Sequence, residues 1–581
     1  MPEAEMSSGN EPRGVLITFG TPPGVERTGN GILLEHHRPD PIPLTLAVDD
    51  ATRMWCYGEL ASYGGEGDTK VCLSQALTDW RAGRLACDQL NGRFLLLIQD
   101  KLTGEWHAIT DRVGSIHAYQ VVQGGRVVAI GSDLATVARR FSTQKMDGHA
   151  LASLFALGFF LADCTFYTDV RVLLPSSIYR ISADGRAASH RRYWEWRHEV
   201  NGARPYHATV EAYDALLRQA VARRAAHGRP ILPISGGLDS RSLALALPAG
   251  ADIPTYSYGY TADSVETQLA AQVARARNLS FTAHVIPAYL FERLPEITRT
   301  LHGCQDVTMA RQMSVNAWVH ERADAVLSGL WGDVWNDQMG LADGLPAKDT
   351  VAVYTFKKMA KRGYTWLIKH LHIPGLENTS IEEMLVQWIG SGLSRFAHIE
   401  DSDFRIKAYK TAQWSFRWSN ASLRGFDPGG VARVPYYDTD LIDFFCTVPT
   451  AFVRDRRLQI DHIKRYAPEL ARIRWQQAEA NLHLASSGYW ISLPRRAFRK
   501  ALRLATCQRP IQRNWEAQFL SQTGREGLQR WLLRPGLALH EFASPREIAT
   551  LLEEMYARPT AANGYTVSML LTFSAWLEVV C

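Results

Sequence analysis

The chain has 581 residues, of which 46% are hydrophobic and 21% charged, so it holds enough apolar side chains for two or three globular domains. Its formal net charge of +5 is spread over this length, and no region is basic enough to indicate nucleic-acid binding. The eight cysteines include no Cys-x-x-Cys pair, which argues against a zinc site or a disulfide framework and is typical of a reducing compartment. There is no signal peptide and no apolar stretch of about 20 residues, so we expect a cytoplasmic protein without integral membrane contact.

Short β-branched and aromatic runs, broken by glycines, fill the region from residue 14 to about residue 196. These runs are Gly14–Gly20, Met54–Tyr57, Phe94–Gln99, Trp106–Thr110 and Val127–Ile130. They predict antiparallel sheets with intervening helices. A short polar linker, residues 201–204, follows this region.

From residue 206 onward, helical and strand patterns alternate. The predicted elements are a helix over 207–226, strands ending at Ser235 and spanning Ile253–Gly259 and Phe281–Ile286, and a helix with a candidate capping box at Asp263–Glu266. This alternation predicts a parallel sheet with helices on both faces. Such sheets bind ligands at the carboxyl ends of their strands. Ser257 and Tyr258 are therefore candidates to lie beside a bound adenine, and the alternative is that they only pack in the core.

The stretch with the clearest chemistry is Ser235-Gly236-Gly237-Leu238-Asp239-Ser240, which joins an apolar strand to a helix. Glycines let the backbone approach a ligand closely, and the free N–H groups at the start of the helix form an anion site. Asp239 adds a carboxylate that suits an accompanying cation. The six residues resemble the pyrophosphate-binding loop of the asparagine-synthetase family, which implies ATP as a ligand.

A second strand-to-turn segment, Ser328-Gly329-Leu330-Trp331-Gly332-Asp333, follows the apolar residues Ala325–Leu327. It resembles the Ser-Gly-x-Gly-x-Asp segment of the same family. The resemblance implies that Ser328 and Gly329 contact ATP and that Asp239 and Asp333 hold Mg²⁺. Two carboxylates suffice for Mg²⁺, because phosphate oxygens and water complete its shell. The structural alternative for Asp333 is a helix N-cap.

The first region resembles the glutaminase half of asparagine synthetases but departs from it where the chemistry occurs. The similar segments are Tyr57–Leu60, Gly67–Val71, Leu90–Phe94 and Asp111–Gly114. The resemblance places Arg13 at the position of the catalytic cysteine, and removal of Met1 would expose Pro2, which has no nucleophile. Tyr57 replaces the oxyanion-hole Asn. We therefore expect a scaffold without glutaminase activity.

Downstream, residues Ala432–Asp438 resemble the family segment that frames the acceptor. Arg433 is a candidate catalytic residue that holds a carboxylate or phosphate, or else a structural ion-pair partner. The family also places a Lys here that stabilises negative charge, and Lys464 is the predicted equivalent, with Arg457 as a competitor. His462 is expected to be an exposed helix residue.

The resemblance implies an α/β protein of three parts. Residues 13–198 form a degenerate Ntn-hydrolase-like αββα domain, and residues 206–475 form a parallel-sheet PP-loop ATP pyrophosphatase, or adenine-nucleotide α-hydrolase-like, synthetase domain. Residues 476–581 form a helical C-terminal extension, in which Arg495–Arg503 predict a basic amphipathic helix, solvated or bound to a membrane surface or an acidic peptide. Trp576 and Leu577 are expected to pack on the synthetase core.

The implied activity is that of an ATP-dependent amide ligase, in which a carboxylate is adenylated and then attacked by an amine. Position 330 carries Glu in asparagine synthetases and Tyr in β-lactam synthetases, whereas this chain has Leu330. The favoured hypothesis is a lasso-type peptide macrolactam cyclase, whose partners include a precursor-processing protease and a leader-binding protein. The alternatives are an enzyme that uses free ammonia or a small amine on aspartate or a sugar acid, a β-lactam-synthetase-like cyclase, and a nucleotide-binding regulatory protein.

Overall fold

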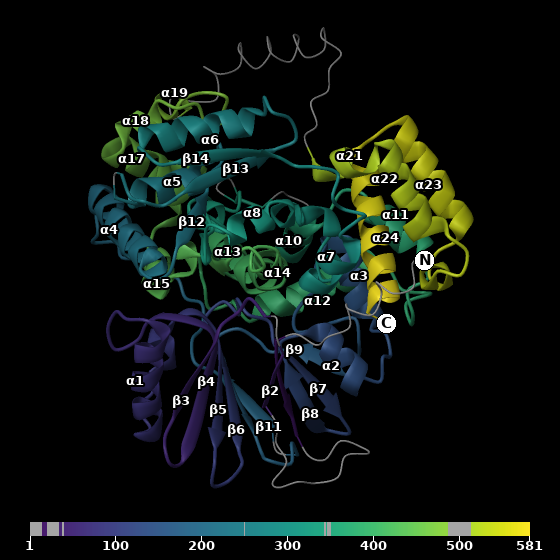
Figure 1. Ribbon diagram of the computed structural model, residues 1–581, viewed down its shortest axis with the longest axis horizontal. Coiled ribbons are helices and arrows are strands. Elements are labelled where there is room, and N and C mark those ends of the chain that lie inside the picture. The colour runs from purple at the N-terminus through teal and green to yellow at the C-terminus, as the bar shows by residue number, and fades with distance from the viewer. Residues whose placement is uncertain are drawn as a thin grey trace.

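The computed structural model describes residues 14–19, 34–37, 40–186, 188–248, 250–341, 344–345, 350–485 and 513–580. Two antiparallel sheets form the N-terminal domain, and a parallel sheet surrounded by helices forms the domain above it in Figure 1. The five-stranded antiparallel sheet has the order β2 (Leu34–His37), β1 (Gly14–Thr18), β8 (Arg126–Gly131), β7 (Tyr119–Gln123), β9 (Val170–Val172). The six-stranded sheet has the order β11 (Ala188–Arg192), β10 (Ser177–Ile181), β6 (Trp106–Thr110), β5 (Asn91–Asp100), β4 (Thr52–Ser62), β3 (Leu44–Val48).

The two antiparallel sheets pack face to face, and each carries helices on its outer face. Along β5, Leu95 and Leu97 point into the core between the sheets, whereas Phe94 and Leu96 pack under helix α1 (Thr69–Arg81). This alternation follows from the two-residue period of a strand. On the other sheet, helix α2 (Leu134–Phe141) covers β7 and β8, and α3 (Gly148–Leu157) follows it. The layers confirm the predicted αββα arrangement.

The synthetase sheet is parallel, as predicted. Its order is β14 (Phe281–Val285), β13 (Thr255–Gly259), β12 (Pro230–Pro233), β15 (Ala325–Leu327), β16 (Val431–Arg433). Helices α4 (Tyr206–Ala225) and α6 (Val265–Ala276) match the predicted helices. The predicted capping box is wrong, because the Ser264 side chain makes no cap hydrogen bond and instead lies against Gly259, where a Cβ would approach it within 2.4 Å.

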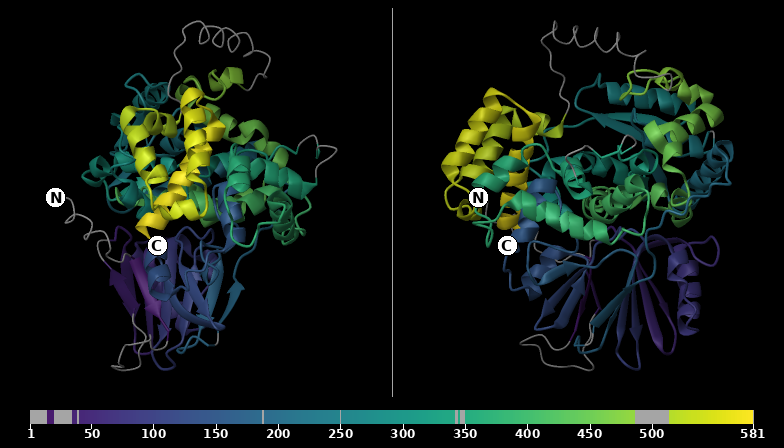
Figure 2. Two further views of the ribbon diagram at one scale, coloured as in Figure 1. Left: turned by 90° about the vertical axis from the view of Figure 1, so that its right-hand side faces the viewer. Right: turned by 180° about the vertical axis from the view of Figure 1, so that it is seen from behind.

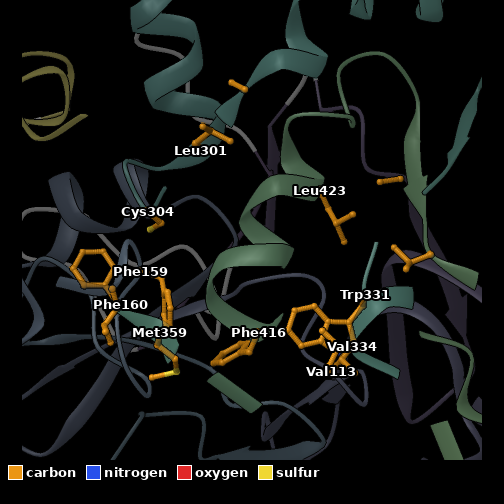
Figure 3. Packing of buried hydrophobic residues seen from close by; sticks show 14 of the residues in the cluster. Val113, Phe159, Phe160, Leu301, Cys304, Trp331, Val334, Met359, Phe416 and Leu423 are labelled. Carbon is orange, nitrogen blue, oxygen red and sulfur yellow. The ribbon is translucent and has the colours of Figure 1, made fainter. Parts of the chain in front are cut away.

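The two domains meet through paired charges and through a continuous apolar core. Arg93 of β5 forms a bidentate pair with Asp427 of the synthetase domain, at 2.5 and 2.8 Å, and Arg112 pairs with Asp443 at 2.8 Å. Beside these pairs, Val113 and Phe416 belong to one buried cluster that includes residues of both domains and of the C-terminal helices. Figure 3 shows Phe416 and Val113 near Trp331 within this cluster.

The C-terminal helices form a bundle against one side of the molecule, coloured yellow in Figures 1 and 2. They comprise α21 (Asn514–Phe519), α22 (Gln522–Leu528), α23 (Pro545–Ala557) and α24 (Ala561–Val579). Trp576 of α24 stacks on Phe166 of the N-terminal domain, with centroids 4.5 Å apart, and also closes on Gly303 of the synthetase domain. Trp576 therefore packs on the synthetase core, as expected, and also on the N-terminal domain. The predicted basic helix at Arg495–Arg503 lies outside the described residues.

Across the described ranges, no helix is both long and apolar enough to cross a membrane. The cysteines at positions 56, 72, 87, 164, 304 and 446 are free thiols, and each is buried.

Candidate active site

The Ser235–Ser240 loop and the Ser328–Asp333 loop lie side by side because of the order of the strands. After β12 the chain builds β13 and β14 on one side and then returns to place β15 on the other side of β12. Both loops therefore leave the carboxyl ends of adjacent parallel strands, at the switch point where open sheets bind ligands. A Cβ on Gly329 would approach the Ser240 amide nitrogen within 3.2 Å, and one on Gly332 would approach Asp239 Cγ within 2.9 Å. The glycines make this close approach of the loops possible.

Hydrogen bonds within the first loop fix its shape. The hydroxyls of Ser235 and Ser240 lie 3.0 Å apart, and the Ser240 hydroxyl accepts from the Ser235 amide at 3.0 Å. Helix α5 (Leu238–Ala246) then begins, with Gly237 as its N-cap residue, and no side chain caps its first turn. The uncapped N–H groups and the positive end of the helix dipole suit a phosphate group.

Two carboxylates and a guanidinium converge on this loop. The Oδ1 of Asp239 accepts hydrogen bonds from Arg456 Nη2 and, at 3.1 Å, from Gln459 Nε2. Burial raises the pKa of Asp239, Arg456 opposes this rise, and the charge of Asp333 adds to it. The pKa of Arg456 is raised: burial opposes this, but Asp239 and Asp333 outweigh it. The contact between Arg456 and Asp239, together with the electrostatic effect of Asp333 on both groups, places the three charges in one cluster.

The donor set at the loops fits Mg²⁺. In the described part of the chain, Asp239 Oδ2 and the Asp333 carboxylate have no hydrogen-bond or ion-pair partner, and Asp333 is exposed toward solvent. Mg²⁺ is usually held by one or two carboxylates together with phosphate oxygens and water. The described residues contain no group of three or more His, Cys, Asp or Glu that could hold a metal without such extra ligands. Asp333 lies inside helix α9 (Gly332–Trp335), whose N-cap is Trp331, so it is not the N-cap that the alternative required.

Arg456 is the cation that the downstream segment brings to the loop, and the sequence did not single it out. It precedes helix α17 (Arg457–Tyr466) with a left-handed φ of 62°, which turns its side chain back toward Asp239. Of the predicted cations, Lys464 pairs with Asp461 at 3.8 Å on the same helix, and Arg457 lies over the Tyr206 ring at 4.2 Å. A run of three basic residues within positions 454–457 was the available signal.

The environments of His462 and Arg433 also differ from simple sequence expectation. His462 was expected to be exposed, but it is fully buried and its Nε2 lies 2.8 Å from Asp214. Arg433 ends β16, where both of its terminal branches are engaged: Glu59 accepts two bonds of 2.7 Å and the carbonyls of Arg224 and His227 accept the others. The structure thus directs Arg433 toward the N-terminal domain and away from the two loops.

The remaining predicted binding residues lie on the central strands or just beyond them. Ser257 is buried in β13, the neighbour of β12, and Tyr258 beside it lies under the guanidinium of Arg311 at 5.8 Å. Ser328 is buried, donates its amide to the Arg433 carbonyl at 2.8 Å and accepts the Leu330 amide on its hydroxyl at 3.3 Å. These contacts hold the second loop in position beside the first.

The acceptor side of the second loop has an unusual backbone. Trp331 adopts a left-handed conformation with φ 73°, which is rare for a bulky residue and marks a strained position. Its ring is buried and its indole nitrogen donates to the Thr411 hydroxyl at 3.3 Å. Thr411 begins a π-helix, Thr411–Ser419, labelled η5. Such widened turns are frequent at functional sites.

In the N-terminal domain, Tyr57 occupies the space next to the start of β1. Its hydroxyl donates to Asp40 Oδ2 at 2.7 Å and lies 3.3 Å from the position of a Cβ on Gly14. The buried ring of Tyr57 cannot supply an amide donor to an oxyanion. Arg13, the residue at the predicted nucleophile position, lies outside the described residues.

Comparisons with known proteins agree with this arrangement. Glutamine amidotransferase domains match residues 57–194, and asparagine synthase matches residues 212–334. No curated protein matches the chain. Among solved structures, one described as the allosteric regulatory enzyme of purine biosynthesis is similar at 9% identity and a TM-score of 0.18, over 45% of this chain. The match spans 64% of the length of that structure.

The fold and the matches define a protein with an N-terminal Ntn amidotransferase-like sheet domain and a C-terminal parallel-sheet asparagine synthase domain. Proteins of the asparagine synthetase B-like family combine these two domains, and the chain resembles them over residues 57–194 and 212–334. An asparagine synthase domain implies an ATP-dependent carbon–nitrogen ligase, and that family generally uses ATP and Mg²⁺.

Proposed function

We propose that this chain is an ATP-dependent amide ligase that adenylates a carboxylate and joins it to an amine supplied by a source other than glutamine hydrolysis within this chain. The observation that carries this proposal is the convergence of Asp239, Asp333 and Arg456 at the uncapped start of α5. Attack on an α-phosphate requires a phosphate loop, carboxylate oxygens that can bind a cation and a guanidinium, and Asp239 Oδ2, Asp333 and Arg456 supply the last two at this loop.

The reaction proceeds in two steps. A carboxylate oxygen of the acceptor attacks the α-phosphorus of ATP, the α–β phosphoanhydride bond breaks and pyrophosphate leaves. An amine then attacks the acyl carbon, AMP leaves and one proton is released. The amides at the start of α5 hold the phosphates, and Arg456 stabilises the negative charge that develops there. Bound Mg²⁺, held by Asp239 and Asp333, would neutralise phosphate charge.

Among ligases of this type, we favour a lasso-type macrolactam cyclase, which closes an Asp or Glu side chain of a precursor peptide onto the peptide's own N-terminal amine. Two observations support an amine from outside the N-terminal domain. Tyr57, held by Asp40, lies beside Gly14 in place of the oxyanion-hole Asn, and Leu330 cannot transfer a proton at the position that carries Glu in asparagine synthetases. Such an enzyme would act with a precursor-processing protease and a leader-binding partner.

A second candidate is an asparagine-synthase-like enzyme that uses free ammonia or a small amine on aspartate or a sugar acid. The observation that favours it is a cavity of about 410 Å³ at the domain interface, lined by residues that include Tyr57, His117, His302 and Arg424. This volume is large enough for a small amine. A β-lactam-synthetase-like cyclase is disfavoured, because the Tyr of those enzymes is Leu330 here.

The test is release of AMP and pyrophosphate from Mg·ATP by the purified full chain, compared with Asp239→Ala. A leader-free candidate peptide and aspartate with ammonium are offered separately. Release with the peptide alone, with loss of one water from its mass, supports the cyclase. Release with aspartate and ammonium supports the second candidate. If ATP binds but neither acceptor triggers release, both substrate assignments are wrong. If ATP does not bind, the ligase proposal is wrong.

A further inference from the structure

Two lysines outside the phosphate loops share one aromatic ring beside the acceptor side of the site. Lys361 follows helix α10 (Val351–Met359), and Lys410 ends helix α13 (Ser402–Lys410). The Lys361 Nζ lies 4.1 Å from the Trp414 ring centroid, and the Lys410 Nζ lies 4.7 Å from the same centroid. Lysines from separate helices thus meet at a single ring of the π-helix.

Further tryptophans extend this aromatic wall toward the second loop. Lys361 also lies 5.5 Å from the Trp418 ring, and Lys410 lies 6.0 Å from Trp331, whose chain continues to Asp333 two residues later. Trp414 and Trp418 meet edge to face, with centroids 5.9 Å apart. We call Lys361, Lys410, Trp331, Trp414 and Trp418 the lysine–tryptophan cluster.

The two cations of this cluster form no hydrogen bond or ion pair within the described part of the chain. Their Nζ atoms lie over tryptophan rings instead. Burial lowers the pKa of both amines, and that of Lys361 falls to about 8. The charge of Lys410 also lowers the pKa of Lys361, and the charge of Lys358 lowers that of Lys410. Cation–π contacts offset only part of the cost of burying a charge.

Three acids act electrostatically on these lysines without forming an ion pair with them: Asp306 acts on Lys361, and Asp333 and Asp337 act on Lys410. Asp306, which faces Lys361, accepts from the Thr308 amide and hydroxyl at 2.8 Å, and burial raises its pKa to about 6. Asp333, which faces Lys410, belongs to the loop pair described above. By contrast, Lys407 on the same helix as Lys410 donates to the Trp335 carbonyl at 3.4 Å, as a structural lysine does.

We propose that the lysine–tryptophan cluster binds a second carboxylate of the acceptor, distinct from the carboxylate that is adenylated. The reacting carboxylate must reach the α-phosphate at the start of α5, whereas the Lys410 Nζ lies over the Trp331 ring and forms no ion pair with Asp333. Two ammonium groups on tryptophan faces provide charge and apolar walls for a carboxylate and its adjoining methylenes. This inference rests on the proposed ligase function and names a feature of its acceptor.

The second carboxylate can belong to a free dicarboxylic acid or to a neighbouring acidic residue of a peptide. Calorimetry on the full chain with Mg²⁺ and α,β-methylene-ATP distinguishes them with two ligand pairs. The first pair is succinate and butyrate, and the second is acetyl-Asp-Asp-amide and acetyl-Asp-Ala-amide. We expect the doubly acidic member of at least one pair to bind about tenfold more tightly or better. The pair that shows the preference identifies the source.

Matched variants assign the preference to the lysine–tryptophan cluster. Lys410→Met and Lys361→Met keep the side-chain length but remove the charge, so each should reduce the preference at least about fivefold, whereas Lys410→Arg should retain it. Lys369→Met, which changes an exposed lysine of helix α11 (Tyr364–His370), should leave it unchanged. Equal affinity of the nucleotide analogue for all variants shows that they are folded.

Two results overturn the inference. One is equal binding of both members in both ligand pairs by the unaltered chain, and the other is a preference that survives in both methionine variants. Either result leaves the ligase proposal intact if the nucleotide analogue still binds. Failure of the unaltered chain to bind that analogue is instead a failure of the proposed function.

Discussion

Arg456 donates a hydrogen bond to Asp239 across 217 residues of sequence, and this contact joins the turn before α17 to the phosphate loop. Gln459, one turn further along α17, donates to the same carboxylate oxygen and to the Ser242 hydroxyl, both at 3.1 Å. The turn before α17 and the start of α5 are therefore held together before any ligand binds. This preorganisation places a fixed positive charge where phosphate charge would develop.

Replacing Arg456 with Ala should lower the rate of pyrophosphate release about 100-fold, because removal of one preorganised donor at a transition state has an effect of this size. Arg457→Ala is the matched control, since Arg457 lies against Tyr206 and pairs with Asp461 at 3.8 Å. We expect less than about a threefold change for the control. Lys464→Ala belongs in the same series, and a larger loss in Lys464→Ala than in Arg456→Ala would reverse our assignment of the cation.

Replacing Gly332 with Ala should push the two loops apart. The added Cβ would lie 2.9 Å from Asp239 Cγ and 2.6 Å from the Tyr436 ring, so the free energy of unfolding should fall by about 1–3 kcal/mol. Activity should fall further than stability, because Asp239 itself must move. Thermal unfolding and pyrophosphate release measure the two effects. Gly202→Ala, where a Cβ meets nothing within 4 Å, should change neither.

The Arg433–Glu59 pair calls for a double-mutant cycle, since the sequence suggested catalysis and the structure gives Arg433 an ion pair between domains. Arg433→Ala and Glu59→Ala should each lower the free energy of unfolding by about 3 kcal/mol, because each leaves a partly buried charge without its partner. The double variant should lose clearly less than the sum. Pyrophosphate release below the melting range should stay near the unaltered level in the double variant. A loss of release that persists there would assign Arg433 to the chemistry.

His117 should make the protein less stable as the pH falls. It is fully buried at the domain interface, where its Nε2 donates to the Phe416 carbonyl at 2.6 Å, and burial lowers its pKa well below the usual value. Because the folded chain resists a proton that the unfolded chain accepts, this contribution to stability is complete above about pH 6.5 and declines below it.

The measurement is the free energy of unfolding between pH 7 and pH 5 for His117→Gln. Its decrease over this range should be smaller than that of the unaltered chain by about 2 kcal/mol. His207→Gln, at an exposed position of helix α4, should leave the decrease unchanged. Equal pH dependence for the two variants would show that His117 accepts a proton in the folded protein.

Local signals in the sequence were sufficient for the strands, the helices and the phosphate loop. The glycines and serines of residues 235–240 shape the loop through contacts with their immediate neighbours, and the apolar run before them defines β12. The geometry of this loop therefore needs few distant contacts. The pairing of that loop with Ser328–Asp333 was implied by the resemblance to asparagine synthetases, and the placement of β15 beside β12 brings the two loops together.

Residues whose surroundings depend on distant segments could not be placed in this way. Arg456 reaches Asp239 because of a left-handed turn at the entry to α17, and no pattern in positions 454–457 distinguishes it from Arg457. His462 is buried against Asp214 of α4, and the polar sequence of α17 gives no sign of this burial. Likewise, the Ser264 side chain makes no cap hydrogen bond, because it packs into the space that Gly259 leaves open.

The shared apolar core couples the unfolding of the three regions. Phe416, Val113 and Trp576 belong to one buried cluster, so separating the regions would expose surface that each now covers for the others. Segments that the sequence divides into three should therefore melt as one cooperative unit, with a single heat-absorption peak in calorimetry. Either half expressed alone should aggregate, whereas the two halves expressed together should assemble into a folded protein.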